Sequence, residues 1–301
     1  MASLICGSLA FDTIMLFEGR FKDQILPEQL HILNVSFLVP SLQRDYGGCA
    51  GNIAYAVCQL GSVPLPMATL GVDAADYLAR LKSLGISDEF VRVVPGTYTA
   101  QAMIMTDLDN NQINAFHPGA MSQAQLNHIQ ARGDIKLGII SPDGSDAMLQ
   151  HAEQFERAGI PFIFDPGQQL PRFDGAQLAR FVEQASWIAV NDYEGKMLCE
   201  RTGWSMADMS KKVKGLIVTL GEAGSEVWLD GERTKIAAFK ATAVVDPTGC
   251  GDAYRGALLH GLEQGWDLPR CAELGNRVGA IKVAQRGPQN YSLAALANTA
   301  S

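Results

Sequence analysis

Residues 246–252, Asp-Pro-Thr-Gly-Cys-Gly-Asp, form the segment of this chain that points most directly to chemistry. A β-branched, apolar run precedes them and a helix-forming run at 253–262 follows. Gly249 and Gly251 leave backbone N–H groups free to point at an anion, and the dipole of the following helix favours negative charge there. Asp252 adds a carboxylate at the same place. An anion cradle beside a potential base predicts phosphoryl transfer to a hydroxyl, with Asp252 accepting the hydroxyl proton.

Residues 47–52, Gly-Gly-Cys-Ala-Gly-Asn, form a second glycine-rich segment ahead of an amphipathic helical pattern. Its three glycines allow a ligand to approach the backbone closely, and Asn52 offers both a donor and an acceptor to ligand hydroxyls. The alternative is a tight turn into a helix, with Asn52 as a capping residue.

Two polar groups follow strand-like runs. Asp12 comes after the run at 4–7, and a carboxylate at the carboxyl end of a parallel strand can accept two hydroxyl hydrogens, as a vicinal diol requires. Gln168 and Gln169 follow the run at 161–164 and can recognise ligand hydroxyls or the edge of a base. A turn or capping aspartate and a plain polar loop are the structural alternatives.

Two more segments suit a nucleotide. Asn191 and Glu194 follow a strand-like run and open a helix, so Glu194 can hold Mg²⁺ through water and Asn191 can reach a phosphate. The alternative is an N-cap with a first-turn acid. A glycine-rich loop at 219–224 follows another strand-like run and can shape a nucleotide edge, or it is a β-turn.

Alternating short apolar runs and helical patterns must position these residues. We predict strands at 4–7, 65–70, 137–140, 161–164, 187–190 and 216–220, and helices at 52–60, 74–84, 122–131, 146–158, 176–184, 192–202, 253–264 and 268–284. Continuous apolar strands are expected where helices cover both faces of a sheet, so the pattern predicts an α/β sandwich with a mostly parallel sheet.

Residues 13–46 and 97–117 break this alternation. Strand-like stretches lie at 31–39, 99–106 and 112–117, and residues 107–111 indicate a hairpin turn between the last two. A small sheet is not stable alone, so we expect it to cover the main domain as a lid or to pair with a second subunit. Phe37 and Phe116 lie on these stretches, where an aromatic ring can stack on a base or simply pack.

The composition excludes several classes. The chain has 301 residues and a formal net charge of −8 without a run of Lys or Arg, which argues against a nucleic-acid or anionic-membrane partner. Its first residues do not show the basic-then-apolar pattern of a signal sequence, no apolar stretch reaches about 18 residues, and its six cysteines and five histidines show no metal-ligand spacing. Scattered thiols fit a reducing compartment, so we expect a cytoplasmic protein. Walker, dinucleotide and nucleophile-elbow motifs are absent.

Residues 246–252 resemble the D-[TP]-[TV]-G-[AV]-G-D signature of the ribokinase (phosphofructokinase-B) family, and residues 47–52 resemble its other signature. Asn191-x-x-Glu194 is similar to the family's magnesium-linked motif, and all landmarks follow the family order along essentially the whole chain. The resemblance implies a ribokinase-like three-layer α/β/α sandwich with a mostly parallel central sheet and a small β-sheet lid. Residues 1–12, 47–96 and 118–301 would form the α/β domain, and 13–46 and 97–117 the lid.

A narrower resemblance, to the bacterial adenosine kinases of the mycobacterial type, rests on residues 19–21 (GRF), 24–31 (QILPEQLH), 116–121 (FHPGAM) and 165–170 (DPGQQL). It implies phosphorylation of the 5′-hydroxyl of adenosine by ATP, giving AMP and ADP, and a homodimer joined through lid strands. A ribokinase-like sugar kinase and an inosine or guanosine kinase remain alternatives, because they share every catalytic motif.

The resemblance also implies roles for single residues. Asp252 would be the base, and Gly249, Cys250 and Gly251 would form the anion hole for the γ-phosphate. The nucleoside would be surrounded by Ser8, Asp12, Gly48, Asn52, Gln168 and Gln169, with Asp12 on the ribose diol and Phe116 on the purine. ATP and Mg²⁺ would be served by Asn191, Glu194, Thr219, Gly221 and Gly224. Asp246 and neighbouring carbonyls would hold a monovalent cation such as K⁺.

Two positions depart from the family pattern. Ala102 stands where the mycobacterial type has a second aromatic residue near the base, so the base would be clamped from one side. Cys250 stands where the family usually has Ala or Val. Because a thiol at a helix N-terminus should have a lowered pKa, we predict that Cys250 is sensitive to alkylation and protected by ATP.

Overall fold

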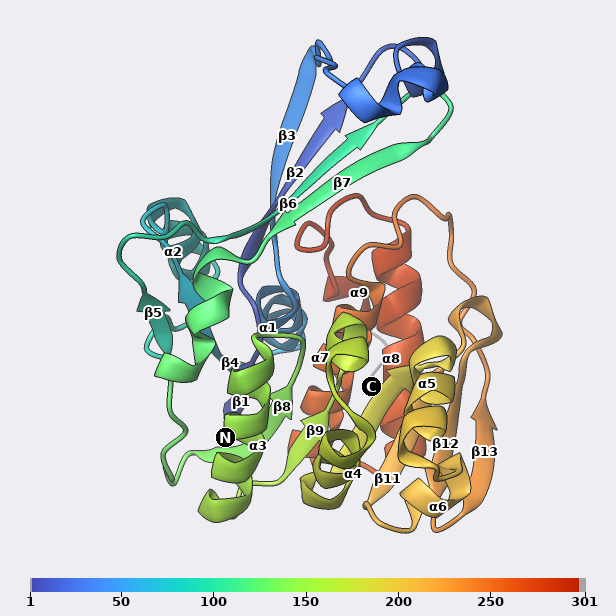
Figure 1. Cartoon of the computed structure of the whole chain (residues 1–301). Coiled ribbons are helices and arrows are strands. Elements are labelled where there is room, and N and C mark those ends of the chain that lie inside the picture. The colour runs from blue at the N-terminus through green and yellow to red at the C-terminus, as the bar shows by residue number, and fades with distance from the viewer. Residues whose placement is uncertain (1, 298–301) are drawn as a thin grey trace.

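Two β-sheets of unequal size organise the chain, and the computed structural model describes them within residues 2–297 (Figure 1). The larger sheet has nine strands in the order β13-β12-β11-β10-β9-β8-β1-β4-β5. It is parallel except for β12 and β13, which pair antiparallel at one edge. The strands are β1 (Ala2–Cys6), β4 (Val63–Leu70), β5 (Val91–Val93), β8 (Ile135–Ile140), β9 (Phe162–Phe164), β10 (Trp187–Asn191), β11 (Gly215–Thr219), β12 (Ser225–Leu229) and β13 (Glu232–Ile236).

Helices cover both faces of this sheet, because alternate strand residues belong to two separate cores. Leu4 shares one core with Phe155 and Phe181, whereas its neighbour Ile5 shares the other with Ile53 and Leu258. The helices are α1 (Cys49–Gln59), α2 (Ala75–Ser83), α3 (Ser145–Ala158), α4 (Gly175–Gln184), α5 (Asp192–Thr202), α6 (Met206–Ser210), α7 (Cys250–Glu263), α8 (Leu268–Val283) and α9 (Ala294–Ala297). The predicted α/β/α sandwich with a mostly parallel sheet is confirmed. Within the described residues, no helix is both long and apolar enough to cross a membrane.

The helix predicted at 122–131 is wrong. The chain forms a 3-10 helix at Gly119–Leu126 with a break in helical geometry at Gln123, and it is extended at Asn127. The Asn127 side chain donates to the carbonyl of Ala68 (2.9 Å) and accepts from Arg92 (3.1 Å). These tertiary hydrogen bonds to β4 and β5 favour an extended conformation over another helical turn.

The smaller sheet rises from one end of the α/β body as a lid (Figure 1). Its strands are β3 (Ser41–Gly47), β2 (Ala10–Leu16), β6 (Ala100–Thr106) and β7 (Gln112–His117), in that order across the sheet. β6 and β7 pair antiparallel through the predicted hairpin. Because β2 begins at Ala10, Asp12 lies on a lid strand and not in a turn after β1, and the lid sheet starts before the predicted boundary at residue 13.

The tip of the lid differs from the prediction of a strand at 31–39. Two 3-10 helices, Phe21–Asp23 and Pro27–Ile32, form there, and 33–39 are described without a regular element. Phe37 packs edge-on against Phe17 (5.0 Å between ring centroids) and Phe21 (5.2 Å). Since Phe37 is held in this aromatic cluster, it does not stack on a base as the alternative interpretation suggested.

Candidate active site

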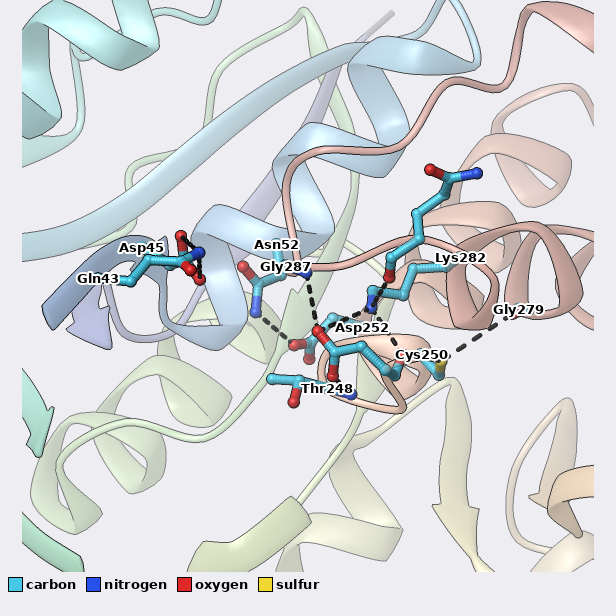
Figure 2. A network of polar contacts seen from close by, with 11 residues as sticks. Gln43, Asp45, Asn52, Thr248, Cys250, Asp252, Gly279, Lys282 and Gly287 are labelled. Atoms are coloured by element: carbon cyan, nitrogen blue, oxygen red, sulfur yellow. Dashed lines mark hydrogen bonds and ion pairs between the residues drawn. The ribbon is translucent and has the colours of Figure 1, made fainter. Parts of the chain in front are cut away.

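The two glycine-rich segments meet at Asp252. α7 begins at Cys250, which places Asp252 in its first turn, and Asn52 lies in the first turn of α1. The Asn52 amide nitrogen donates to Asp252 Oδ2 at 2.8 Å (Figure 2). Burial raises the pKa of Asp252 above its ordinary value, although the Asn52 hydrogen bond opposes the shift. The pair therefore presents one oriented carboxylate whose basicity is higher than that of a solvated aspartate.

A chain of hydrogen bonds fixes the orientation of Asn52. Gln289 Nε2 donates to Asn52 Oδ1 at 3.1 Å and lies 3.0 Å from the Tyr77 hydroxyl. Tyr77 in turn donates to the carbonyl of Gly47 at 2.6 Å, where β3 leaves the lid. Because the Asn52 oxygen is occupied by Gln289, its nitrogen must face Asp252. Gln289 follows no recognisable motif, so the sequence did not indicate it.

The turn before α7 forms the expected cradle. Gly249 has φ +77°, and a Cβ there would lie 2.8 Å from Pro288, so this position requires glycine. The amide of Cys250 donates to the carbonyl of Pro247 at 3.1 Å, while no acceptor among the described residues takes the amides of Gly251 and Asp252. The amide of Gly249 likewise has no acceptor among the described residues, so the amides at 249, 251 and 252 are available to an anion, whereas that of Cys250 is used within the turn.

The prediction of a lowered pKa for Cys250 is wrong. Burial raises the pKa of the Cys250 thiol, and the nearby Lys282 ammonium reduces this shift without reversing it. The sulfur lies near two backbone carbonyls, of Asp246 (4.0 Å) and Gly279 (3.9 Å). Desolvation of the thiolate thus outweighs the effect of the helix N-terminus.

A cavity of about 1160 Å³ extends from this centre across the carboxyl ends of β9, β10 and β11. Predicted site residues that line it are Asn52, Gln168, Asn191, Glu194, Thr219, Gly221, Gly224, Gly249, Cys250, Gly251 and Asp252. Ala238, Phe239, Val244, Ala280 and Val283 give it an apolar wall. A cavity of this volume that is lined by both an anion cradle and an apolar wall is suited to a nucleotide.

Asn191 and Glu194 form a capping box at the start of α5. The Asn191 side chain accepts from the Glu194 amide at 2.7 Å, and Glu194 Oε2 accepts from the Asn191 amide at 2.8 Å. The structural alternative is therefore realised, yet both side chains also line the cavity. The cap uses the side-chain oxygen of Asn191 and one carboxylate oxygen of Glu194. The side-chain nitrogen of Asn191 and the other oxygen of Glu194 can therefore still contact a phosphate or its counterion.

Arg255 lies one turn after Asp252 and is buried between two further carboxylates. It is 3.1 Å from Asp165 and 3.9 Å from Glu194, and it also donates to the carbonyl of Ala189 (3.2 Å). Burial raises the pKa of Asp165 despite the opposing effect of Arg255. The Arg255 guanidinium thus compensates the negative charges of Asp165 and Glu194 close to Asp252. The sequence spacing did not indicate this role.

A row of residues on one face of the lid points toward the same centre. Asp12 pairs with Asp45 on one side and with Ala102 on the other, and Ala102 pairs with Phe116. Directly opposed residues share a face of a sheet. Burial raises the pKa of Asp12 to about 6, and the negative charges of Asp45 and Asp252 add to this shift. Phe116 is 56% exposed, which leaves its ring available for stacking.

The remaining predicted residues support the cavity from its edge. Ser8 accepts from the amide of Cys49 at 3.2 Å, and Gly48 has φ +84° in a place where a Cβ would contact Ser8 and Ala10. Gln168 lines the cavity, whereas Oε1 of Gln169 is buried without a partner among the described residues. Ser8, Asp12, Gly48, Phe116, Gln169 and Asp246 are not among the lining residues of the nucleotide cavity.

Comparison with known proteins agrees with this geometry. The family model for pfkB family carbohydrate kinases matches residues 20–295. The chain belongs to this family. A nucleoside kinase of Methanocaldococcus jannaschii is 30% identical over 293 residues, covering 96% of this chain and 93% of that protein. The Burkholderia thailandensis nucleoside kinase in complex with inosine is 55% identical, with a TM-score of 0.85 over 96% of this chain and 93% of that one. Its complex described as ADP-inosine is 56% identical, with a TM-score of 0.83 over 96% and 91% of the two chains.

The family thus accounts for the fold and for an ATP-dependent kinase activity. The residues of the site can be compared with the Mg²⁺ ion that the sequence resemblance implies. The described residues contain no cluster of three or more His, Cys, Asp or Glu side chains able to hold a metal by themselves. Mg²⁺ needs only one or two carboxylates besides phosphates and water, and Glu194 provides such a group at the cavity wall.

The predicted monovalent cation at Asp246 does not fit this member of the family. Lys282, which has 0% relative exposure, places its ammonium 2.8 Å from the Asp246 carbonyl and 3.6 Å from Asp246 Oδ2. The ammonium also donates to the carbonyl of Gln285 at 3.1 Å. A cation bound by these oxygens would lie against a positive charge, so the expectation for Asp246 and K⁺ is corrected.

Proposed function

We propose that the protein is an ATP-dependent kinase that transfers a phosphoryl group to the 5′-hydroxyl of a purine nucleoside. The observation that supports this best is the position of Asp252. It lines the large cavity in the first turn of α7, beside the anion cradle, and it is oriented by Asn52 at 2.8 Å. The Burkholderia and Methanocaldococcus relatives, both called nucleoside kinases, support a nucleoside as the acceptor.

Asp252 acts as the general base. Its raised pKa brings its basicity closer to that needed to accept a hydroxyl proton during attack on the γ-phosphorus. The free amides of Gly249, Gly251 and Asp252, at the positive end of α7, stabilise the charge on the transferring group. The positive φ of Gly249 and the hydrogen bond of the Cys250 amide within the turn hold the backbone of this cradle in place. The sequence predicted the cradle at residues 249–251.

The row of lid residues formed by Asp45, Asp12, Ala102 and Phe116 binds the nucleoside. Asp12 accepts both ribose hydroxyls, and Phe116 stacks on the base from the same face of the sheet. Asn52, Ser8 and Gly48 complete the ribose end. Gln168 and Gln169 recognise the remaining polar edge, which gives a partner to the buried Oε1 of Gln169.

ATP lies in the large cavity with its base against the apolar wall and its phosphates toward α7. Thr219, Gly221 and Gly224 border the nucleotide, and Asn191 contacts a phosphate. Glu194 holds Mg²⁺ through water, and the ion, when bound, neutralises charge on the phosphates.

We propose adenosine as the acceptor, with inosine as the second candidate because the Burkholderia relative has been described with inosine. The Ala102–Phe116 pair provides one aromatic face only, which favours tolerance among purines. A coupled ADP-release assay with adenosine, inosine, guanosine, ribose and fructose tests the proposal. Phosphorylation of both purine nucleosides is expected, with kcat/KM at least about tenfold above that for either sugar. A preference for ribose or fructose would instead favour the sugar-kinase alternative.

We also propose a homodimer joined through lid strands. The lid presents exposed apolar side chains, including Leu38 (86% exposed), Leu42 and Ile113, and its edge strands β3 and β7 have one unpaired side. Size-exclusion chromatography with light scattering is expected to give twice the chain mass, and a monomer at micromolar concentration would refute the dimer. The six cysteines are all unpaired, which supports our proposal of a cytoplasmic location.

A further inference from the structure

The side chain of Lys282 is buried at the base of the turn that forms the anion cradle. It leaves α8 near the end of that helix, and its ammonium meets the carbonyls of Asp246 (2.8 Å) and Gln285 (3.1 Å). The Asp246 carboxylate completes its surroundings at 3.6 Å. A lysine without solvent exposure is rare unless its charge is compensated, and here the ammonium has two carbonyl hydrogen bonds and a carboxylate beside it.

Asp246 connects this lysine to the cradle. Its Oδ1 accepts from the Thr248 amide (2.9 Å) and its Oδ2 from the Gly287 amide (2.8 Å). Figure 2 shows Lys282, Thr248, Cys250 and Gly287 gathered around the same turn. Although burial opposes it, these amides hold the pKa of Asp246 below its ordinary value. The Asp246 carboxylate is therefore an anion that links the turn before α7 to the segment after α8. Lys282 links the same two segments through the carbonyls of Asp246 and Gln285.

The oxygen atoms around Lys282 are of the kind that bind a dehydrated monovalent cation. Backbone carbonyls and one carboxylate replace the water shell of such an ion. An ammonium is a compact point charge that makes the same contacts as a donor, and it is attached covalently to the fold. Because both cannot occupy this place, a K⁺ ion here would require the lysine to leave.

We propose that Lys282 is a built-in replacement for a monovalent cation, which holds the 246–252 turn in its anion-binding geometry without any ion from solution. Lys282 is a positioning residue, since it acts through Asp246 and the turn and does not touch the reacting atoms. The reaction should therefore be independent of K⁺. The kinetic part of this inference rests on the proposed kinase function, while its effect on stability does not.

The test compares the wild type with Lys282→Ala and Lys282→Met in tetramethylammonium chloride, KCl and NH₄Cl at a constant ionic strength of about 0.1 M. ATP is added as its Tris salt. Thermal unfolding followed by circular dichroism, without ligands, reports on the turn itself. The kcat of ADP release reports on the cradle. Lys136→Ala is the matched control, because Lys136 is an exposed lysine on β8, away from the turn.

For the wild type we expect thermal midpoints within about 1 °C and kcat within about twofold in all three salts. Lys282→Ala in tetramethylammonium should lose at least about tenfold in kcat, and KCl or NH₄Cl should restore most of the loss and raise the midpoint. Lys282→Met, which fills the site with apolar atoms, should lose activity without rescue. Lys136→Ala should behave as the wild type.

Activation of the wild type several-fold by KCl would overturn the proposal. So would a folded Lys282→Ala protein that keeps full activity in tetramethylammonium, or one that neither small cation rescues. If both variants fail to fold in every salt, the wild-type measurements decide alone. If no acceptor is phosphorylated at all, the proposed function fails, and the salt dependence of the thermal midpoints still tests the role of Lys282.

Discussion

We expect the ionised Asp12 carboxylate to lower the stability of the unliganded protein, although the same charge favours binding of the acceptor. Replacement of Asp12 by Asn should therefore increase the free energy of unfolding and weaken nucleoside binding. Burial and, to a smaller extent, three carboxylates (Asp45, Asp252 and Asp246) raise the pKa of Asp12 from its ordinary value of 3.8 to about 6. At about 1.4 kcal/mol for each pH unit, the ionised form costs the folded state roughly 3 kcal/mol, and residual solvent contact reduces this to about 2 kcal/mol. Asp12→Asn should therefore be more stable than the wild type by about 2 kcal/mol at neutral pH.

The sign follows from proton binding. Between pH 3.8 and about 6 the folded protein binds more protons at Asp12 than the unfolded chain does, so this residue lowers stability as the pH rises through that window. Asn does not titrate. The stability gained by the variant should be small at about pH 4, should increase up to about pH 6, and should stay constant above that value.

Urea denaturation of wild type and Asp12→Asn at about pH 4 and about pH 7.5 measures this difference. The same variant should raise the nucleoside KM by about 10- to 100-fold, because charge-assisted hydrogen bonds to the diol are lost. Asp45→Asn is the matched control, since it removes a neighbouring charge but keeps Asp12, and it should move the acid limb of the nucleoside KM to lower pH. The reasoning is refuted if Asp12→Asn is less stable than the wild type at about pH 7.5.

Four further outcomes are expected. Asp252→Asn should lower kcat by about 100-fold or more with nearly unchanged nucleoside binding in calorimetry, and more than half of the activity remaining would exclude it as the base. Gln289→Leu should lower kcat by about tenfold, because the Asn52 side chain is then no longer held in the orientation that donates to Asp252, and the KM for ATP should stay unchanged as an internal control. Because the pKa of the Cys250 thiol is raised, iodoacetamide should label it more slowly at neutral pH than free cysteine, and faster labelling would contradict the burial argument. Arg255→Met should lower the free energy of unfolding by about 3–5 kcal/mol, and adding Asp165→Leu should recover part of that loss.

Local signals predicted the elements that hold the nucleotide. Asn191 and Glu194 are recognisable as a helix start from their spacing alone, and the structure shows the corresponding capping box. The predicted apolar runs form neighbouring parallel strands, whose carboxyl ends lie together. Asp165, Asn191 and Thr219 are therefore near one another at this end of the sheet. These features depend on residues close in sequence, so the sequence was sufficient to find them.

The errors occurred where distant residues decide the structure. The apolar stretch at 31–39 has strand-like composition, but Phe37 packs on Phe17 and Phe21 at the lid tip. The pKa of Cys250 follows its burial and not its place on the helix. Arg255 and Lys282 were missed because their partners lie 90 and 36 positions away along the chain, and isolated basic residues in a helical pattern carry no signal of such pairing.

The hydrogen bond between Gln289 and Asn52 joins positions 237 residues apart. Gly287, Pro288 and Gln289 all lie beside the proposed catalytic centre, so this centre combines residues made early and residues made late during synthesis. Domains generally fold as units during synthesis. A chain that has not yet reached residue 289 lacks the side chain that orients Asn52, although α1 and all strands of the central sheet come earlier in the sequence. The hydrogen-bond network that orients Asn52 toward Asp252 is therefore complete only once residue 289 is free to reach Asn52.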